Sequence, residues 1–372
     1  MSKLIIRGGK PLSGHHIVPG NKNAALPMLA ATLLADGPVT LTNLPNIADV
    51  RVMADGLVAL GAKVTGSIAE HTLTVDPRRL RADPVLPADI CTRIRTSFLF
   101  VGPLLARKGR IRLRGAPGGD SIGRRRLDTH VNGFTALGAK VTLRKTGSAT
   151  ALAPKGLLGT DFMLDEASVM GTENLVMAAV LAKGRTVLYN TACEPHVQNL
   201  CAMLNQMGAK IEGIGTNRLV IEGVPHLSGG TFRVGGDAIE AASYLIAAAA
   251  TRGSITLQGV SRADMAVLQP AFRKLGVRWV WEDEDTLRLP PRQRLRTAYD
   301  LGAAIPKIED GPWPMIPSDL LSPLIVLATQ TRGTELFFEK MFESRLYFVD
   351  HLIGMGAKIV QCDPHRAVVT GP

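Results

Sequence analysis

The sequence contains few aromatic residues and no long hydrophobic segment. Phe, Trp and Tyr together make up 5% of its 372 residues, so few rings are available to stack on nucleic-acid bases. The apolar runs, of which residues 24–34 are typical, have the length of an amphipathic helix and are too short to span a bilayer. We therefore expect neither nucleic acid nor a membrane as a partner.

Cysteine is also scarce, and its pattern points to a reducing compartment. The four cysteines have neither CxxC spacing nor histidine partners, which predicts reduced structural thiols: Cys91, Cys193, Cys201 and Cys362. We expect no signal peptide ahead of the first strand, at residues 3–7, and therefore a cytoplasmic protein. The length exceeds one typical core, which favours two domains.

Acidic residues are outnumbered by basic ones, and the net charge of +11 predicts an anionic partner. Eight basic residues and a single acid, Asp120, lie between positions 107 and 126. Arg110, Arg112 and Arg114 alternate along an expected strand, and a solvated strand edge explains them as well as a binding role does. The arginines at 124–126 suit bidentate binding of a phosphorylated small molecule.

One pattern occurs five times: an apolar helix, a glycine, a strand, and a second helix that ends at Leu-Gly or Met-Gly. The two glycines are 23 or 24 residues apart in four copies and 29 apart in the second copy. They are Gly37 and Gly61, Gly109 and Gly138, Gly184 and Gly208, Gly253 and Gly276, and Gly333 and Gly356. A fixed period predicts stacked supersecondary units. The second copy gains its extra residues in loop 115–126, which is the first candidate for chemistry.

A larger duplication divides the chain into two related halves. The stretch from Leu4 to Gly14 reappears from Leu219 to Gly229, and Gly20 and Gly37 reappear as Gly236 and Gly253, an offset of 215 to 216 residues. The first half holds three repeats and the second holds two. The symmetry therefore predicts a sixth repeat of about 60 residues beyond Pro372.

The first apolar helix opens with a lysine. Lys22 and Asn23 precede the helix expected over residues 24–35. A lysine at this position opposes the helix dipole, but beside unpaired backbone N–H groups it suits an anionic ligand. The corresponding start in the second half carries Asp237 and Glu240, an acidic and stabilising cap.

Two further helix starts have both a structural and a functional interpretation. Ser318 or Asp319 in the fifth repeat, and Ser168 in the third, are suitable N-caps. Stacking of the repeats would bring these helix starts to corresponding edges of the two domains. A cleft at such edges is a usual place for a ligand.

Short motifs that fit these positions follow one another along the whole chain. They are Gly20-Asn21-Lys22-Asn23-Ala24-Ala25-Leu26-Pro27, Arg95 before Gly102-Pro103-Leu104, Gly118-Gly119-Asp120-Ser121-Ile122-Gly123 with Arg125, Asp128 and His130, Ser168-Val169, Thr172-Glu173-Asn174, Glu194-Pro195, Pro317-Ser318-Asp319 and Phe342-Glu343-Ser344-Arg345. In this order they resemble the UDP-N-acetylglucosamine enolpyruvyl transferase family and, more remotely, enolpyruvylshikimate phosphate synthase.

The resemblance implies an α/β fold of two inside-out barrel domains built from βαβαββ-type units, three per domain. The first domain would span residues 22–234. The second would combine residues 1–21 with 235–372, with the N-terminal strand pairing into it. No metal and no organic cofactor is implied, and the substrates would be phosphoenolpyruvate and a nucleotide sugar.

The resemblance also implies a role for individual residues. Lys22 and Arg125 would bind phosphoenolpyruvate, Asp319 would take the proton of the attacking hydroxyl, and Asp120 would be the loop acid. The remaining implied substrate contacts are Asn23, Arg95, Arg126, Leu127, Asp128, Thr129, Ser168, Val169, Glu194, Met341 and Arg345.

Three departures from the family pattern affect these expectations. Many relatives carry cysteine where this chain has Asp120, so we expect insensitivity to fosfomycin, an epoxide that alkylates thiolates. Many relatives carry a lysine before the Ser-Val pair, where this chain has Asp165 and Glu166, followed by Met170. The third departure is the absence of arginines that relatives supply from a sixth repeat.

Three functions remain open at this point. The first is enolpyruvyl transfer to UDP-N-acetylglucosamine at the start of peptidoglycan synthesis. The second is the same transfer to another nucleotide or sugar. The third is a non-catalytic binding protein that kept the fold.

Overall fold

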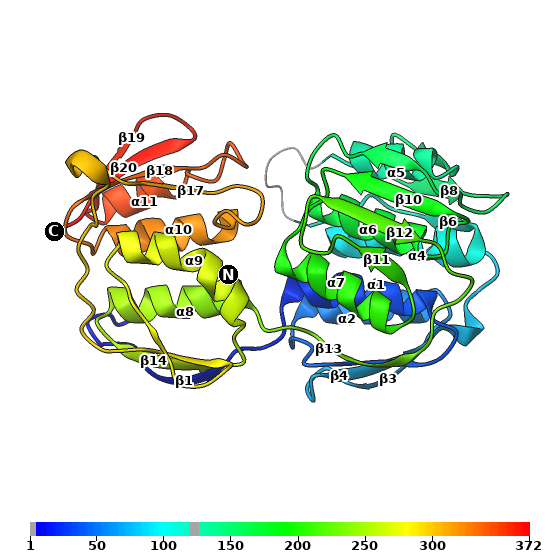
Figure 1. The fold of residues 1–372 in the computed structure, drawn as a ribbon, viewed down its shortest axis with the longest axis horizontal. Helices are drawn as coiled ribbons and strands as arrows, with labels where there is room; N and C mark the ends of the chain where they lie inside the picture. Colours follow the sequence, from blue (N-terminus) through cyan, green and yellow to red (C-terminus); the bar gives the residue numbers. More distant parts are fainter. Residues whose placement is uncertain (1–4, 120–125) are drawn as a thin grey trace. The chain divides into compact units, whose positions relative to one another are not determined.

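The computed structural model describes residues 5–119 and 126–372, which form two units (Figure 1). One unit is continuous, Pro19–Gly235, and the other combines Met1–Val18 with Gly236–Pro372. The sequence-based boundaries were 21/22 and 234/235. None of the helices in the described parts of the chain has the length and apolar character needed to cross a bilayer.

Five four-stranded sheets, all with one topology, are found among the described residues. In each, an outer strand is parallel to a central strand, which pairs antiparallel with one arm of a β-hairpin. The continuous unit has three: β13 (Gly230–Arg233), β2 (Val39–Thr42), β4 (Thr72–Asp76) and β3 (Lys63–Ser67); β5 (Val85–Leu86), β6 (Arg110–Leu113), β8 (Ala149–Leu152) and β7 (Lys140–Leu143); β9 (Asp161–Met163), β10 (Arg185–Tyr189), β12 (Arg218–Glu222) and β11 (Lys210–Glu212).

The discontinuous unit has two sheets of the same kind. They are β1 (Ser13–Ile17), β14 (Ser254–Gln258), β16 (Thr286–Leu289) and β15 (Val280–Trp281); and β17 (Lys307–Glu309), β18 (Thr334–Phe338), β20 (Arg366–Thr370) and β19 (Lys358–Gln361). The five repeats inferred from the glycine spacing are therefore present as five sheets.

Each repeat contributes an inner helix before its central strand and an outer helix after it. The inner helices are α1 (Lys22–Ala31) with η1 (Thr32–Leu34), α4 (Val101–Lys108) after η3 (Arg95–Phe100), α6 (Val169–Ala179), α8 (Ala238–Ala250) and α10 (Ser318–Ala328). The outer helices are α2 (Ala48–Ala59), α5 (Asp128–Ala136), α7 (Pro195–Gln206), α9 (Arg262–Lys274) and α11 (Val349–Gly354). Short segments α3 (Ala88–Arg93), η2 (Pro77–Arg79) and η4 (Leu301–Ala303) lie between them.

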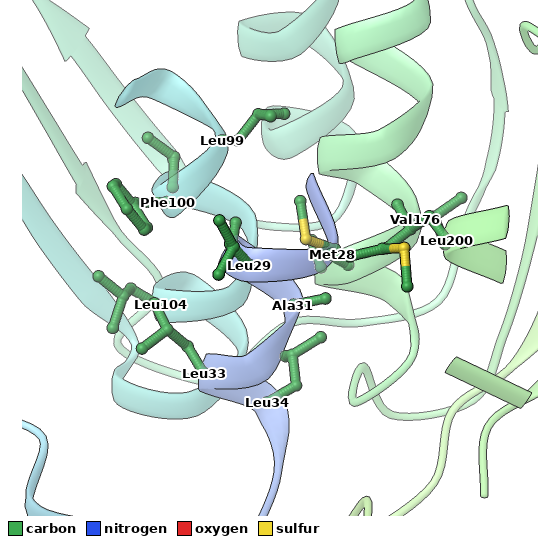
Figure 2. Close-up of a cluster of buried hydrophobic side chains, with 14 of the residues drawn as sticks. Met28, Leu29, Ala31, Leu33, Leu34, Leu99, Phe100, Leu104, Val176 and Leu200 are labelled. Carbon is green, nitrogen blue, oxygen red and sulfur yellow. The ribbon is translucent and has the colours of Figure 1, made fainter. Parts of the chain in front are cut away.

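The inner helices form the core, and two of them are buried on every side. Every residue from Ala24 to Ala31 is buried, as is every residue from Gly171 to Ala179. Figure 2 shows side chains of α1 and η1 packed between those of η3 and α4 on one side and Val176 and Leu200 on the other. A helix that is hydrophobic all round must be enclosed, so the sheets and outer helices lie outside it.

The closing glycine of each repeat ends its outer helix in the left-handed conformation. All five have positive φ, between 78° and 107°: Gly61, Gly138, Gly208, Gly276 and Gly356. Each follows the C-cap residue, at the position where glycine is favoured because a Cβ would be strained. This backbone requirement is the physical basis of the repeated Leu-Gly and Met-Gly pattern.

The outer strands β1 and β13 are exchanged between the two halves of the chain. β1 precedes β2 in the sequence but pairs with β14, with Ser13 opposite Ser254. β13 precedes β14 but pairs with β2, with Gly230 opposite Val39. Each half of the chain therefore supplies the outer strand of the first sheet in the other half.

The strand-edge interpretation of the arginines on β6 is wrong. β6 pairs with β5 on one side and with β8 on the other, so it lies inside its sheet. The alternation itself is correct, because Arg110 and Arg112 are exposed and the intervening Ile111 is buried. Arg112 donates to Asp83 and forms part of a solvated sheet face.

Candidate active site

Lys22 is the first residue of α1 and is exposed, although the helix behind it is buried. The Asn21 side chain caps the helix by accepting a hydrogen bond from Ala24 N at 3.1 Å. Gly20 lies directly under a carbonyl, because a Cβ there would be 1.9 Å from Asn43 O. No carboxylate in the described residues pairs with Lys22. The ammonium group and the helix start are together suited to an anion. Asn23 follows and is half-buried.

Arg95 lies where both ends of the long second-repeat loop return to the protein. Gly118 N donates to Cys91 O at 2.9 Å, and a Cβ on Gly118 would be 1.7 Å from Thr92 O. At the far end, Arg95 Nη2 donates to Arg126 O at 3.3 Å. The loop therefore begins and ends on the segment that carries Arg95. Asp120 and Arg125 lie outside the described residues.

The starts of α5 and α6 lie side by side. The Thr129 hydroxyl, in the first turn of α5, donates to Asp165, which precedes α6. A Cβ on Gly171 would be 3.1 Å from the Thr129 methyl and 3.0 Å from Ser168. Ser168 is the N-cap of α6 and accepts from Gly171 N at 3.2 Å, so its cap interpretation is confirmed. Val169 begins the helix and is half-buried.

Arg126 and the acids around it form the exposed rim of this region. Arg126 Nε donates to Asp128 at 3.0 Å, and this bond is the main cause that raises the pKa of the guanidinium. Asp165 and Glu166 add smaller contributions of the same sign. The two acids that depart from the family pattern therefore lie near an arginine. Leu127 lies between Arg126 and Asp128 in the sequence, is the N-cap residue of α5 and is half-buried.

Glu194 is the N-cap residue of α7, and a buried glutamate lies close to it. Glu173 in α6 is fully buried, and burial together with the nearby Glu194 raises its pKa well above the ordinary value. Its Oε1 has no hydrogen-bond partner among the described residues. The sequence motif included Glu173, but nothing in the sequence signalled the proximity of the two carboxyl groups, which come from different helices.

Asn174 and His130 connect three helices beneath these residues. Asn174 accepts from Gly102 N at 2.8 Å and donates to Phe98 O at 2.9 Å and to His130 Nδ1 at 3.2 Å. Full burial, with Arg95 nearby, lowers the pKa of His130 to about 3. The ring is therefore neutral and acts as a hydrogen-bond acceptor that fixes α5 against α6.

Asp319, Arg345 and Met341 belong to the discontinuous unit. Asp319 is in the first turn of α10, and Arg345 Nη2 donates to its Oδ1. The Asp319 side chain is 54% exposed, and no hydrogen bond of Oδ2 is found in the described part of the chain. One carboxylate oxygen is thus bound by an arginine, and the side chain as a whole remains half exposed. Met341 is exposed on the segment after β18.

The N-cap interpretation of Ser318 and Asp319 is wrong. The N-cap residue is Pro317, and no side chain caps the helix. Ser318 donates to Glu339, a buried residue directly after β18. Sequence reasoning missed Glu339 and its neighbour Asp310. The available signal was an acid at position 339 on the same strand face as the apolar Phe337.

The comparisons with known proteins identify the fold and the family. The family model for EPSP synthase (3-phosphoshikimate 1-carboxyvinyltransferase) matches residues 6–370. The fold is similar to the enolpyruvyl transferase NikO from Streptomyces tendae, with a TM-score of 0.83, 24% identity, and 99% of this chain and 84% of that chain covered. EPSP synthase from Acinetobacter baumannii matches with a TM-score of 0.74 and 16% identity, covering 99% and 83%. The class is therefore that of the two-domain enolpyruvyl transferases.

Sequence relatives define the family more narrowly. UDP-N-acetylglucosamine 1-carboxyvinyltransferase from Treponema denticola is 50% identical over 372 residues, which is 100% of this chain and 86% of the relative. The protein of that name from Bradyrhizobium diazoefficiens is 48% identical over 370 residues, 100% of this chain and 84% of the relative. The chain belongs to the UDP-N-acetylglucosamine 1-carboxyvinyltransferase family, and the resemblance seen in the sequence motifs is confirmed.

Proposed function

We propose that this protein transfers the enolpyruvyl group of phosphoenolpyruvate to the 3'-hydroxyl of UDP-N-acetylglucosamine, releasing phosphate, as the committing step of peptidoglycan synthesis. The observation that carries the proposal is identity of 50% with a relative of this name over the whole of this chain. The protein is a transferase, and the cytoplasm, where we propose that it works, fits four cysteines that are all free.

The transfer proceeds in this proposal by addition and then elimination. Asp319 Oδ2 takes the proton of the attacking sugar hydroxyl, whose oxygen bonds to C2 of phosphoenolpyruvate while C3 receives a proton. Asp120 is the proposed acid for that proton. Loss of a C3 proton and of phosphate from the tetrahedral intermediate then restores the double bond.

Binding residues have separate tasks. Lys22, at the start of a buried helix, and Arg125 neutralise the phosphate and carboxylate of phosphoenolpyruvate. Asn23 and Glu194 contact the acceptor and the intermediate. The nucleotide sugar is bound by Arg95, Arg126, Leu127, Asp128, Thr129, Ser168, Val169 and Met341, and Arg345 keeps Asp319 oriented.

The direct test is phosphate release from phosphoenolpyruvate by the purified protein with and without UDP-N-acetylglucosamine. Acceptor-dependent release and a product heavier by one enolpyruvyl group in mass spectrometry are expected. Binding of UDP-N-acetylglucosamine in calorimetry without any turnover would favour a non-catalytic binding protein instead.

A second candidate is enolpyruvyl transfer to a different nucleotide or sugar. It is supported by Asp165 and Glu166, two acids near Arg126 at the position where many relatives carry a lysine. Calorimetry with UDP-N-acetylglucosamine and with other nucleotide sugars would separate the candidates, since the true acceptor binds more tightly than its analogues.

A further inference from the structure

Two buried carboxyl groups lie together behind Asp319. Asp310 follows β17 and Glu339 follows β18, and neither residue is exposed to solvent. Because β17 and β18 are parallel, both residues leave the sheet at the same edge. The register pairs Glu309 with Phe338, so Asp310 and Glu339 are the next residues on adjacent strands, and a hydrogen bond between their carboxyl groups is among the causes that raise the pKa of Glu339. Two carboxylates cannot share a hydrogen bond unless one of them carries a proton.

The surrounding hydrogen bonds agree with one shared proton. Asp310 Oδ1 accepts from Lys340 N at 2.6 Å, but its Oδ2 has no hydrogen-bond donor in the part of the chain that is described. A proton between this oxygen and Glu339 satisfies it. Burial, and then the neighbouring Asp310, raises the pKa of Glu339 to about 7.

Glu339 organises the residues that flank Asp319. Its Oε1 accepts from Met341 N at 2.9 Å and from Phe342 N at 3.0 Å. The Ser318 hydroxyl, on the residue before Asp319, lies 3.1 Å from Oε1 and 2.9 Å from Oε2. One buried carboxyl group therefore fixes both the start of α10 and the segment after β18.

Arg345 connects this pair to Asp319. Its Nη2 donates to Asp319, while its Nε lies 4.0 Å from Glu339 Oε2 and is buried without a hydrogen-bond partner among described atoms. A distance of 4.0 Å is too long for a hydrogen bond. The guanidinium group is thus bound to the Asp319 carboxylate. It lies close to the Glu339 carboxyl group but must move to form a hydrogen bond with it.

The other charged groups around Glu339 are already occupied. His365 Nδ1 lies 2.8 Å from the backbone carbonyl of Glu339, on the side of the β19–β20 hairpin. Lys340 Nζ pairs with Glu309 at 2.8 Å, on β17. Of the cations described here, Arg345 is therefore the one placed to respond to a change of charge on the pair.

We propose that Asp310 and Glu339 share one proton and act as positioning residues that hold Arg345 in its contact with Asp319. This inference rests on the proposed role of Asp319 as the base. Loss of the shared proton leaves two negative charges, which attract Arg345 Nε toward Glu339. Nη2 then withdraws from Asp319, and the base loses its orientation.

The test is the pH dependence of turnover from about pH 5 to about pH 9, each protein normalised to its own rate on the acid side. The wild-type rate should fall about tenfold per pH unit once the shared proton is lost. Asp310→Asn, whose amide can donate in place of that proton, should abolish the fall. Glu339→Gln should also abolish the fall in rate. Agreement between the two variants would show that the effect does not come from misfolding of one of them.

A matched control is available on the same strand. Glu335 is also buried, and burial raises its pKa to about 7, but it bonds Thr297 and lies at the other end of β18. Glu335→Gln should keep the wild-type profile. A wild-type rate that does not fall, or one that falls equally in Asp310→Asn, would overturn the proposal.

A second readout needs no substrate. In a ¹⁵N NMR titration, the Arg345 Nε signal, assigned by its loss in Arg345→Lys, should shift with pH in the wild type and stay constant in Asp310→Asn. Absence of turnover with the proposed substrates would refute the proposed function alone. An Nε signal that titrates identically in both proteins, or in neither, would refute the positioning role.

Discussion

At the scale of single residues, a substitution of Asp319 should affect the rate of catalysis much more than the stability of the fold. Its carboxyl group does not cap α10, is half exposed and pairs with Arg345, so Asp319→Asn, whose amide oxygen can still accept from Arg345, should lower the free energy of unfolding by about 0–1 kcal/mol. If Asp319 is the base, turnover should fall on the order of 10²–10⁴-fold. Steady-state phosphate release and denaturant unfolding measure the two effects.

Ser261→Ala provides the opposite control in the same unit. Ser261 is a true cap, which accepts from Asp264 N at 3.3 Å at the start of α9. Its loss should cost about 0.5–2 kcal/mol and leave the rate unchanged. An Asn variant at 319 that keeps most of its rate would remove Asp319 from the mechanism.

Glu173 should make the protein less stable as the pH rises. An acid whose pKa is raised in the folded state keeps its proton there and releases it on unfolding. Stability therefore falls by about 1.4 kcal/mol per pH unit from the unfolded pKa up to the folded one. In Glu173→Gln this loss is absent, so the stability of the variant should rise relative to that of the wild type as the pH increases above the ordinary glutamate pKa of 4.5.

Denaturant unfolding followed by circular dichroism at several pH values measures this difference. Glu222→Gln, at an exposed glutamate paired with Arg185, is the control and should show no such trend. A stability difference between Glu173→Gln and the wild type that stays constant with pH would mean that Glu173 is not protonated in the folded protein.

The role of a residue could be predicted from the sequence where its interaction partner is close to it in the sequence. Ser168 was recognised as a cap because the helix start and its hydroxyl lie within four residues. The same reasoning failed at Ser318, since its hydroxyl bonds instead to Glu339, whose position depends on the pairing of β17 with β18. A partner 21 residues away cannot be read from a capping pattern.

At the scale of helices and strands, the duplicated glycines before α1 and α8 allow a matched comparison. A Cβ on Gly20 would be 1.9 Å from Asn43 O, and a Cβ on Gly236 would be 2.0 Å from Gly259 O. Both alanine variants should lose about 1–3 kcal/mol through overpacking. Only Gly20→Ala displaces Lys22, so it alone should raise KM for phosphoenolpyruvate.

The measurement is KM for each substrate, together with unfolding curves for both variants. Equal changes of KM in Gly20→Ala and Gly236→Ala would mean that the start of α1 has no special part in binding. Gly37→Ala, where the nearest atom to the new Cβ is 3.9 Å away, should behave like the wild type.

The helices and repeats were predicted well because their signals are local, but the strand expected at residues 3–7 was wrong, since residues 5–9 have no regular structure and β1 begins at Ser13. Short sequence segments show both the apolar inner helices and the glycine that ends each outer helix. The five repeats could therefore be counted directly from the sequence. Strand partners could not be obtained in the same way. The segments that become β1 and β13 occupy equivalent places in the two halves of the duplication, and neither segment contains a local signal for the sheet that it joins.

At the scale of the whole molecule, the exchange of β1 and β13 makes the two units unequal as fragments. Residues 19–235 contain three complete sheets, β13 included, and should fold when expressed alone. Residues 236–372 lack β1, so the sheet of β14 would lose its parallel outer strand, and this fragment should be poorly folded until a peptide of residues 5–18 is added.

Tryptophan fluorescence reports on the second fragment, because Trp279, Trp281 and Trp313 all belong to that unit. A blue shift on addition of the peptide is expected, whereas a peptide of residues 226–234, the duplicate that forms β13, should be less effective. A fragment 236–372 that folds fully without peptide would contradict the importance of β1.

The exchanged strands also determine the order in which the sheets can form while the chain is synthesised on the ribosome. Ser13 is made 241 residues before its partner Ser254. At about 5–20 residues per second, the strand must wait roughly 10–50 s with its backbone unpaired. The continuous unit, complete once β13 has emerged, is finished during that interval. The continuous unit is thus complete before β1, which precedes it in the sequence, can pair with β14.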